Sequence, residues 1–155
     1  VVSRVKLNLI VQEMEFQLDE TSSFLNTETK EIVSVSDDEF GAAEDEEPIK
    51  NLPDWQQEGI KMAREVSDNY GDLWIPLPSK FDINEYSIME RFCLSLTNDK
   101  LRDIMYYSIK GKGAFRRFKN NIRKYRIEQD WYEYRHESLK AVAIEWCEEN
   151  GIEYE

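Results

Sequence analysis

The chain has 155 residues, with 20 Lys and Arg against 32 Asp and Glu, so its formal net charge is −12. A chain of this length buries roughly 70% of its unfolded surface, and its 4 Trp, 8 Tyr and 7 Phe supply large groups for a core. The composition excludes a disordered chain and predicts one acidic domain over residues 1–155. No apolar run approaches the roughly 18 residues of a membrane span, and a secretory signal is not recognisable, so we expect a cytoplasmic protein.

Residues 5–36 predict a helix followed by a β-hairpin. Leu7, Ile10 and Met14 follow helical spacing, and the continuation QEMEFQ favours a helix over the strand that the alternation at the start also allows. Two β-prone runs, residues 23–25 and 31–35, then flank a polar turn and predict the hairpin.

Residues 37–50 predict an acidic loop. Seven carboxylates lie among the eleven residues from Asp37 to Glu47, and such a run repels itself and buries little. An alternative is that this run forms a lid over a basic surface of the same chain, because a tethered segment has a high effective concentration.

Residues 53–155 form the predicted helical part, apart from the segment LWIPLPSKF, whose prolines permit only an edge strand or a polyproline-like run. Helices are predicted over residues 54–71, 82–96, 98–108, 114–125 and 130–150. Asp82 and Glu85 have the spacing of a capping box for the second of these helices, and Asn98 or Thr97 is predicted to cap the third. The predicted class is therefore α+β and mainly helical, with a small N-terminal β-hairpin and a C-terminal helical bundle.

Residues 110–126, KGKGAFRRFKNNIRKYR, carry eight Lys and Arg and no acid. Helical spacing leaves the cations on the flank that adjoins a docking seam of Phe115, Phe118, Ile122 and Tyr125. A Gly-Lys-Gly turn before this helix adds free backbone N–H groups and the positive end of the helix dipole. The residues predicted to bind an anion or a partner are Lys112, Gly113, Arg116, Arg117, Lys119, Arg123 and Lys124.

The partner of these cations stays open between three classes. An acidic protein or a phosphate-bearing ligand is the leading interpretation, and the chain's own acids are a competitor. Nucleic acid is an alternative, since Arg and Lys neutralise phosphates and exposed aromatic rings stack on bases. The net charge of −12 counts against a polyanion unless the charges are segregated along the chain.

Three aromatic residues of the C-terminal segment, Trp131, Tyr132 and Tyr134, have two interpretations. They serve as packing residues of the core, or they contribute to an interaction surface such as a homodimer face.

Catalytic chemistry has little support in the sequence. GxSxG and phosphate-binding-loop motifs are not recognisable, and His136 is the single histidine. Cys93 and Cys147 lie in apolar helical patterns, which indicates buried packing thiols. We therefore predict no catalytic residue, no metal and no cofactor, and keep an enzyme with an unrecognised carboxylate site as an alternative.

Three motifs, GKGAFRRFKN, then WYEYR, then IEWCEENGI, resemble a family of bacterial proteins of unknown function. The N-terminal EMEFQLDETSSFLNTETKEIV and the acidic middle extend the resemblance over nearly the whole chain. The family often has Thr-Gly at the hairpin turn, where this chain has Thr29 and Lys30. The resemblance implies a single-domain bacterial cytosolic protein and brings no activity, ligand or catalytic residue.

Overall fold

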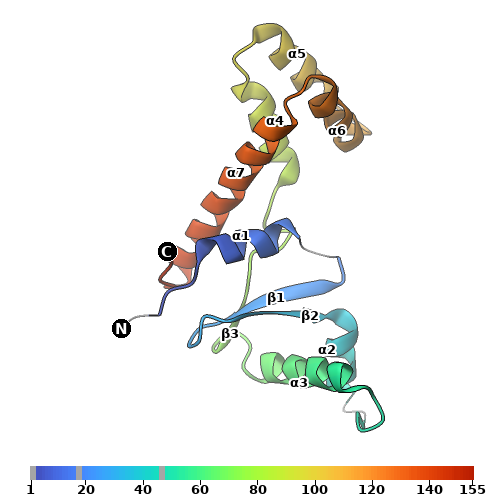
Figure 1. The fold of residues 1–155 in the computed structure, drawn as a ribbon, viewed down its shortest axis with the longest axis vertical. Helices are drawn as coiled ribbons and strands as arrows, with labels where there is room; N and C mark the ends of the chain where they lie inside the picture. Colours follow the sequence, from blue (N-terminus) through green and yellow to red (C-terminus); the bar gives the residue numbers. More distant parts are fainter. Residues whose placement is uncertain (1–2, 17–18, 46–47) are drawn as a thin grey trace. The chain divides into compact units, whose positions relative to one another are not determined.

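The computed structural model describes residues 3–16, 19–45 and 48–155, and it divides the chain into two compact units (Figure 1). The first unit comprises residues 1–80 and 142–155, and the second comprises residues 81–141. The α+β, mainly helical class is confirmed, because helices predominate and three short strands form one antiparallel sheet. A single domain over 1–155 stays a prediction.

The first unit is built on the predicted hairpin, which is confirmed. β1 (Thr21–Asn26) pairs antiparallel with β2 (Ile32–Ser36), with Phe24 opposite Val33. The Asn26 side chain holds the turn by accepting hydrogen bonds from the backbone N–H groups of Glu28 and Thr29, both at 2.9 Å. This is the Asx-turn geometry that Asn favours.

β3 (Trp74–Pro76) pairs with the other side of β1, so the strand order is β2-β1-β3. Pro76 therefore lies on an edge strand, as its missing N–H requires. Both faces of the sheet are covered, because Phe24 and Leu25 point to opposite faces and both are buried.

α1 (Leu7–Glu15) covers the Leu25 face of the sheet and confirms the predicted N-terminal helix (Figure 1). The Glu13 carboxylate accepts hydrogen bonds from the hydroxyl groups of Ser23, at 3.0 Å, and Ser34, at 3.3 Å. The buried residues of α1 are Leu7, Ile10, Val11 and Met14. Residues 17 and 18, the end of the predicted helix, lie outside the described residues.

The prediction of an acidic loop over 37–50 is wrong for most of its length, because α2 (Asp37–Glu44) is a helix. Ser36 and Glu39 form a capping box: the Ser36 hydroxyl accepts from the Glu39 N–H at 3.1 Å, and the Glu39 carboxylate accepts from the Ser36 N–H at 2.9 Å. The three acids of the first turn complement the positive end of the helix dipole. Residues 46 and 47 of the run lie outside the described residues.

α2 packs on α3 (Asp54–Asp68), and the two helices cover the Phe24 face of the sheet. The core between them contains Phe24, Val35, Ala43, Ile60, Ala63, Val66 and Trp74. The acidic run is therefore amphipathic: Ala43 and Phe40 contact the core, while the carboxylates of its first turn stay at the helix end.

The second unit contains three short helices, α4 (Glu85–Ser95), α5 (Asp99–Ser108) and α6 (Ala114–Lys124), and most of α7 (Glu128–Glu149). α4 begins at an N-cap Asn84, whose side chain accepts from the Ser87 N–H, so the capping box predicted from Asp82 and Glu85 is wrong. Asn98 caps α5 as predicted.

The core of the second unit is a cluster of aromatic rings in edge-to-face contact. The ring of Phe92 lies 5.3 Å from that of Trp131 and 6.1 Å from that of Phe118, centroid to centroid. Phe118 and Trp131 are closer still, at 4.7 Å. These separations lie within the favourable range for aromatic pairs, so the cluster joins α4, α6 and α7 within this unit.

The inward face of α6 differs from the predicted seam. Ala114, Phe118 and Ile122 are buried, whereas Phe115 is 58% exposed. The buried positions follow i, i+4 and i+8, which turns the face by one residue from the expected one. The prediction was correct for Phe118 and Ile122 and wrong for Phe115, because the small Ala114 takes the inward place.

Truncation of the two phenylalanines of α6 should therefore change the free energy of unfolding by different amounts. We expect Phe118→Ala to lower the free energy of unfolding by about 3–5 kcal/mol, because it removes a ring of the core cluster and leaves a cavity. Phe115→Ala should change it by less than about 0.5 kcal/mol. Urea unfolding followed by circular dichroism measures both, and equal losses would contradict the assigned orientation of α6.

Candidate functional site

The Gly-Lys-Gly turn leads directly into α6. Gly111 and Gly113 both have positive φ, 76° and 82°, and Gly113 is the N-cap of the helix. These backbone angles favour glycine, and they leave Lys112 exposed at the start of α6.

Arg117, one of the residues predicted to bind an anion, has its guanidinium engaged by backbone carbonyls of its own unit. Its guanidinium donates to three backbone carbonyls: Nε to Ser108 at 2.6 Å, and the two terminal nitrogens to Lys112 at 2.5 Å and Lys110 at 2.7 Å. These carbonyls lie at the end of α5 and in the following turn, where helix carbonyls lack intrahelical partners. Arg117 is therefore a structural clamp between α5 and α6.

Arg123 has a partner but remains accessible. Its Nε lies 3.1 Å from the Glu128 carboxylate, and its side chain is 62% exposed. An exposed ion pair of this kind contributes about 0–1 kcal/mol and exchanges readily with another anion.

The remaining predicted cations are exposed, and none of them forms an ion pair within the described residues. They are Lys112, Arg116, Lys119 and Lys124. The Lys124 ammonium lies 5.2 Å from the centre of the neighbouring Tyr125 ring. We call these four residues together with Arg123 the α6 cationic surface.

Lys110 belongs to the basic segment but is held elsewhere. Its ammonium lies 3.8 Å above the centre of the Tyr106 ring and 3.5 Å from the Glu90 carboxylate. The interaction with the Tyr106 hydroxyl raises the pKa of Lys110; desolvation opposes it, and weaker charge effects from Tyr106, Tyr86 and Glu90 add to it. It therefore stays charged and contributes mainly to the contact between α4 and α5.

The three predicted interaction aromatics are in different environments. Trp131 is buried in the core cluster, which leaves no ring surface for a partner. Tyr134 is half-buried, with its ring 5.5 Å from Phe92, and Tyr132 is 51% exposed. The sequence interpretation missed Phe115, which is exposed one helical turn before Lys119.

The charges are strongly segregated between the two units. Residues 81–141 contain 13 Lys and Arg against 9 Asp and Glu, a net charge of +4. Residues 1–80 and 142–155 contain 7 against 23, a net charge of −16. The overall charge of −12 therefore conceals a cationic unit that carries the α6 cationic surface.

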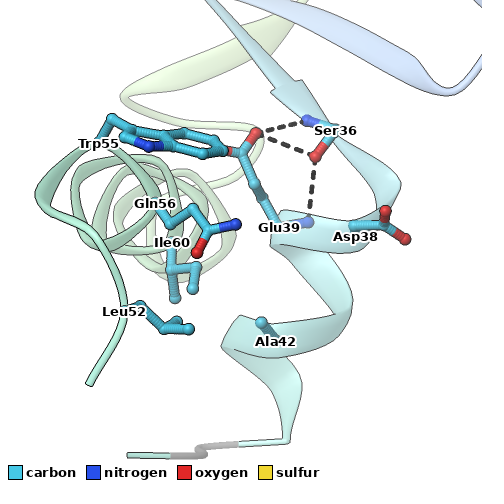
Figure 2. Close-up of a pocket in the computed structure, with 8 residues that line it drawn as sticks. All are labelled: Ser36, Asp38, Glu39, Ala42, Leu52, Trp55, Gln56 and Ile60. Carbon is cyan, nitrogen blue, oxygen red and sulfur yellow. Dashed lines mark hydrogen bonds between the residues drawn. The ribbon is translucent and has the colours of Figure 1, made fainter. Parts of the chain in front are cut away.

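A second concave feature lies in the acidic first unit, between α2 and α3. It is a pocket of about 440 Å³ (Figure 2). The lining residues are Ser36, Asp38, Glu39, Ala42, Leu52, Trp55, Gln56 and Ile60. Sequence reasoning missed it, because it forms only when two helices separated along the chain pack together.

The nucleophilic and metal-binding inventory of the described residues is poor. Cys93 and Cys147 are buried, as predicted, and burial raises the pKa of each thiol to about 11, so neither is a good nucleophile at neutral pH. Within residues 3–16, 19–45 and 48–155, no group of three His, Cys, Asp or Glu side chains is placed to hold a metal ion. No helix in this part of the chain is long and apolar enough to cross a membrane.

Comparison with known proteins gives a family and no activity. The model of an uncharacterised protein family, UPF0158, matches residues 4–155. A Pseudomonas aeruginosa PAO1 protein named "UPF0158 protein PA5073" is 30% identical over 69 residues, covering 39% of this chain and 45% of the relative. The aligned part thus spans less than half of that relative's length. No solved structure matches the chain.

The clamp and the free cation on α6 differ in their expected effects on stability. We expect Arg117→Ala to lower the free energy of unfolding by about 1–3 kcal/mol, because three carbonyls lose a charged donor. Arg116→Ala should change it by less than about 0.5 kcal/mol. Urea unfolding of the two variants is the measurement, and a stable Arg117→Ala protein would show that the clamp is dispensable.

Proposed function

The chain belongs to the uncharacterised protein family UPF0158, and we propose that it is a non-catalytic binding module whose α6 cationic surface holds an acidic partner or a phosphate-bearing ligand. The observation that carries this proposal is the set of exposed cations on α6 without ion-pair partners among the described residues. The cytoplasmic location, the bacterial origin and a homodimer stay predictions.

The environment of these cations supports binding to an anion. They stand on a unit of net charge +4, so the charges of their own unit favour an anion. The aromatic core and the Arg117 clamp hold the helix from its other side. The backbone that carries the cations is therefore already in place before an anion binds, which lowers the entropic cost of binding.

The turn before α6 adds a second element of recognition. The N-terminus of a helix offers unpaired N–H groups and a positive dipole end, and Lys112 stands beside it. Phosphate groups accept hydrogen bonds from such N–H groups and from Arg and Lys together. This combination favours a phosphate-bearing ligand over a carboxylate surface of a protein.

Charge reversal on α6 tests the proposal. We expect Arg116→Glu combined with Lys119→Glu to weaken binding of sodium polyphosphate roughly tenfold or more at low salt, because two attractive contacts become repulsive. Fluorescence anisotropy with end-labelled polyphosphate measures the affinity, and wild-type affinity should fall as salt is raised.

A matched control is available in the same unit. Arg91→Glu combined with Lys100→Glu changes the net charge equally at two exposed positions of α4 and α5. This variant should retain most of the affinity. Equal losses in both double variants, or no binding by the wild-type protein at low salt, would refute a localised site on α6.

Nucleic acid is a second candidate, and the exposure of Phe115 favours it. A ring beside a row of cations is the arrangement on which single-stranded bases stack, at about 1–3 kcal/mol per base. Tyr107 and Tyr132 of the same unit are also exposed, at 71% and 51%. The charge segregation weakens the objection that a chain of net charge −12 repels a polyanion.

Phe115→Ala separates stacking from simple charge attraction. If the ligand is a single strand, the variant should bind a 12-nucleotide RNA or DNA about tenfold more weakly and bind polyphosphate unchanged. Because Phe115 is exposed, we expect the Phe115→Ala variant to fold like the wild-type protein. An unchanged affinity for both probes would remove the nucleic-acid candidate and leave the anion-binding proposal intact.

A further inference from the structure

The pocket between α2 and α3 combines an apolar floor with the carboxylates of Asp38 and Glu39. Ala42, Leu52 and Ile60 supply aliphatic surface, and Trp55 supplies an aromatic wall (Figure 2). Trp55 is 71% exposed, so its indole remains open to a ligand. The volume of about 440 Å³ lies in the range of small-molecule sites.

Glu39 contributes a carboxylate to the lining of the pocket. One of its oxygens, Oε1, accepts from the Ser36 N–H at 2.9 Å and from the Ser36 hydroxyl at 3.0 Å. The other, Oε2, makes no hydrogen bond with the described residues. Glu39 and Trp55 both line the pocket (Figure 2), so a ligand that enters it meets a carboxylate and an aromatic ring.

Gly59 of α3 makes this position of the carboxylate attainable. A Cβ at residue 59 would lie 1.6 Å from Oε2 of Glu39, a distance that real atoms do not adopt. A helix-interior glycine costs roughly 1 kcal/mol relative to alanine. Here the missing side chain provides the space in which the Glu39 carboxylate lies against α3.

The aromatic ring of Trp55 and the carboxylate of Glu39 together favour one class of ligand. A cation is attracted to an aromatic face and to a carboxylate, and its apolar chain gains from an aliphatic floor. A neutral ligand would cover Oε2 without offering it a charged partner. An anion is disfavoured by Glu39 and by a unit of net charge −16.

We propose that this pocket binds a small organic cation, an ammonium or guanidinium group on a short aliphatic chain. The cationic group donates to Oε2 of Glu39 beside the indole of Trp55. The aliphatic chain lies over Leu52, Ile60 and Ala42. This site is separate from the α6 cationic surface and does not depend on its function.

Butylamine, 1-butanol and butyrate each contain four carbon atoms and differ in charge, and they form the first test. Saturation-transfer NMR with the full chain, at millimolar ligand, should detect butylamine and agmatine in the pocket. We expect 1-butanol and butyrate to bind at least about tenfold more weakly, which is a difference of about 1.4 kcal/mol. Equal signals for butylamine and 1-butanol, or no signal for either cation, would overturn the proposal.

Two neighbouring carboxylates of α2 supply matched variants. Glu39→Gln removes the charge but keeps the capping box, because Gln serves at that position as well as Glu. Asp37→Asn removes the same charge from an exposed carboxylate of the first turn of α2 that does not line the pocket. We expect Glu39→Gln to weaken butylamine binding about tenfold and Asp37→Asn to change it less than about twofold.

The pair of variants decides between a local site and a general field. Equal loss in Glu39→Gln and Asp37→Asn would mean that the net charge of the unit attracts the amine, and it would overturn the assigned site. Unchanged binding in both would overturn it as well. Trp55→Ala should also lose affinity for butylamine while keeping its circular dichroism spectrum, since Trp55 is exposed.

Discussion

α6 is held in place by the edge-to-face contacts among Phe92, Phe118 and Trp131, and the properties of its outer surface follow from them. The rings fix which side of the helix faces inward. The Arg117 guanidinium then donates a hydrogen bond to the Ser108 carbonyl at the end of α5. With the inner side settled, Arg116 and Lys119 must point to solvent, so a packing constraint creates a charged surface without any ligand present.

Charge segregation gives this surface its significance. A cation on a chain of net charge −12 attracts a distant anion only weakly. The unit of residues 81–141, however, has a positive net charge of its own. The acids are concentrated in the other unit, where part of them cap and flank α2. The pocket beside Glu39 and the α6 cationic surface thus suit ligands of opposite charge.

Local patterns predicted much of the fold, and tertiary packing decided what they missed. Alternation and a polar turn were enough for the hairpin, and Asn98 was recognisable as a cap. Charge density misled the prediction for 37–50, although Ser36 and Glu39 had the spacing of a capping box. The inward place of Ala114 and the pocket between α2 and α3 depend on the packing of elements that are separated along the chain, and the carbonyl partners of Arg117 depend on how α5 ends, so no periodic pattern contains them.

The central claim is that phosphate groups bind the chain at the α6 cationic surface. A ¹H–¹⁵N NMR titration of the full chain with polyphosphate at low salt tests it most directly. The account predicts the largest shifts at the amides of residues 111–124, and their loss as salt is raised. Shifts centred in residues 1–80, or none at low salt, would contradict it.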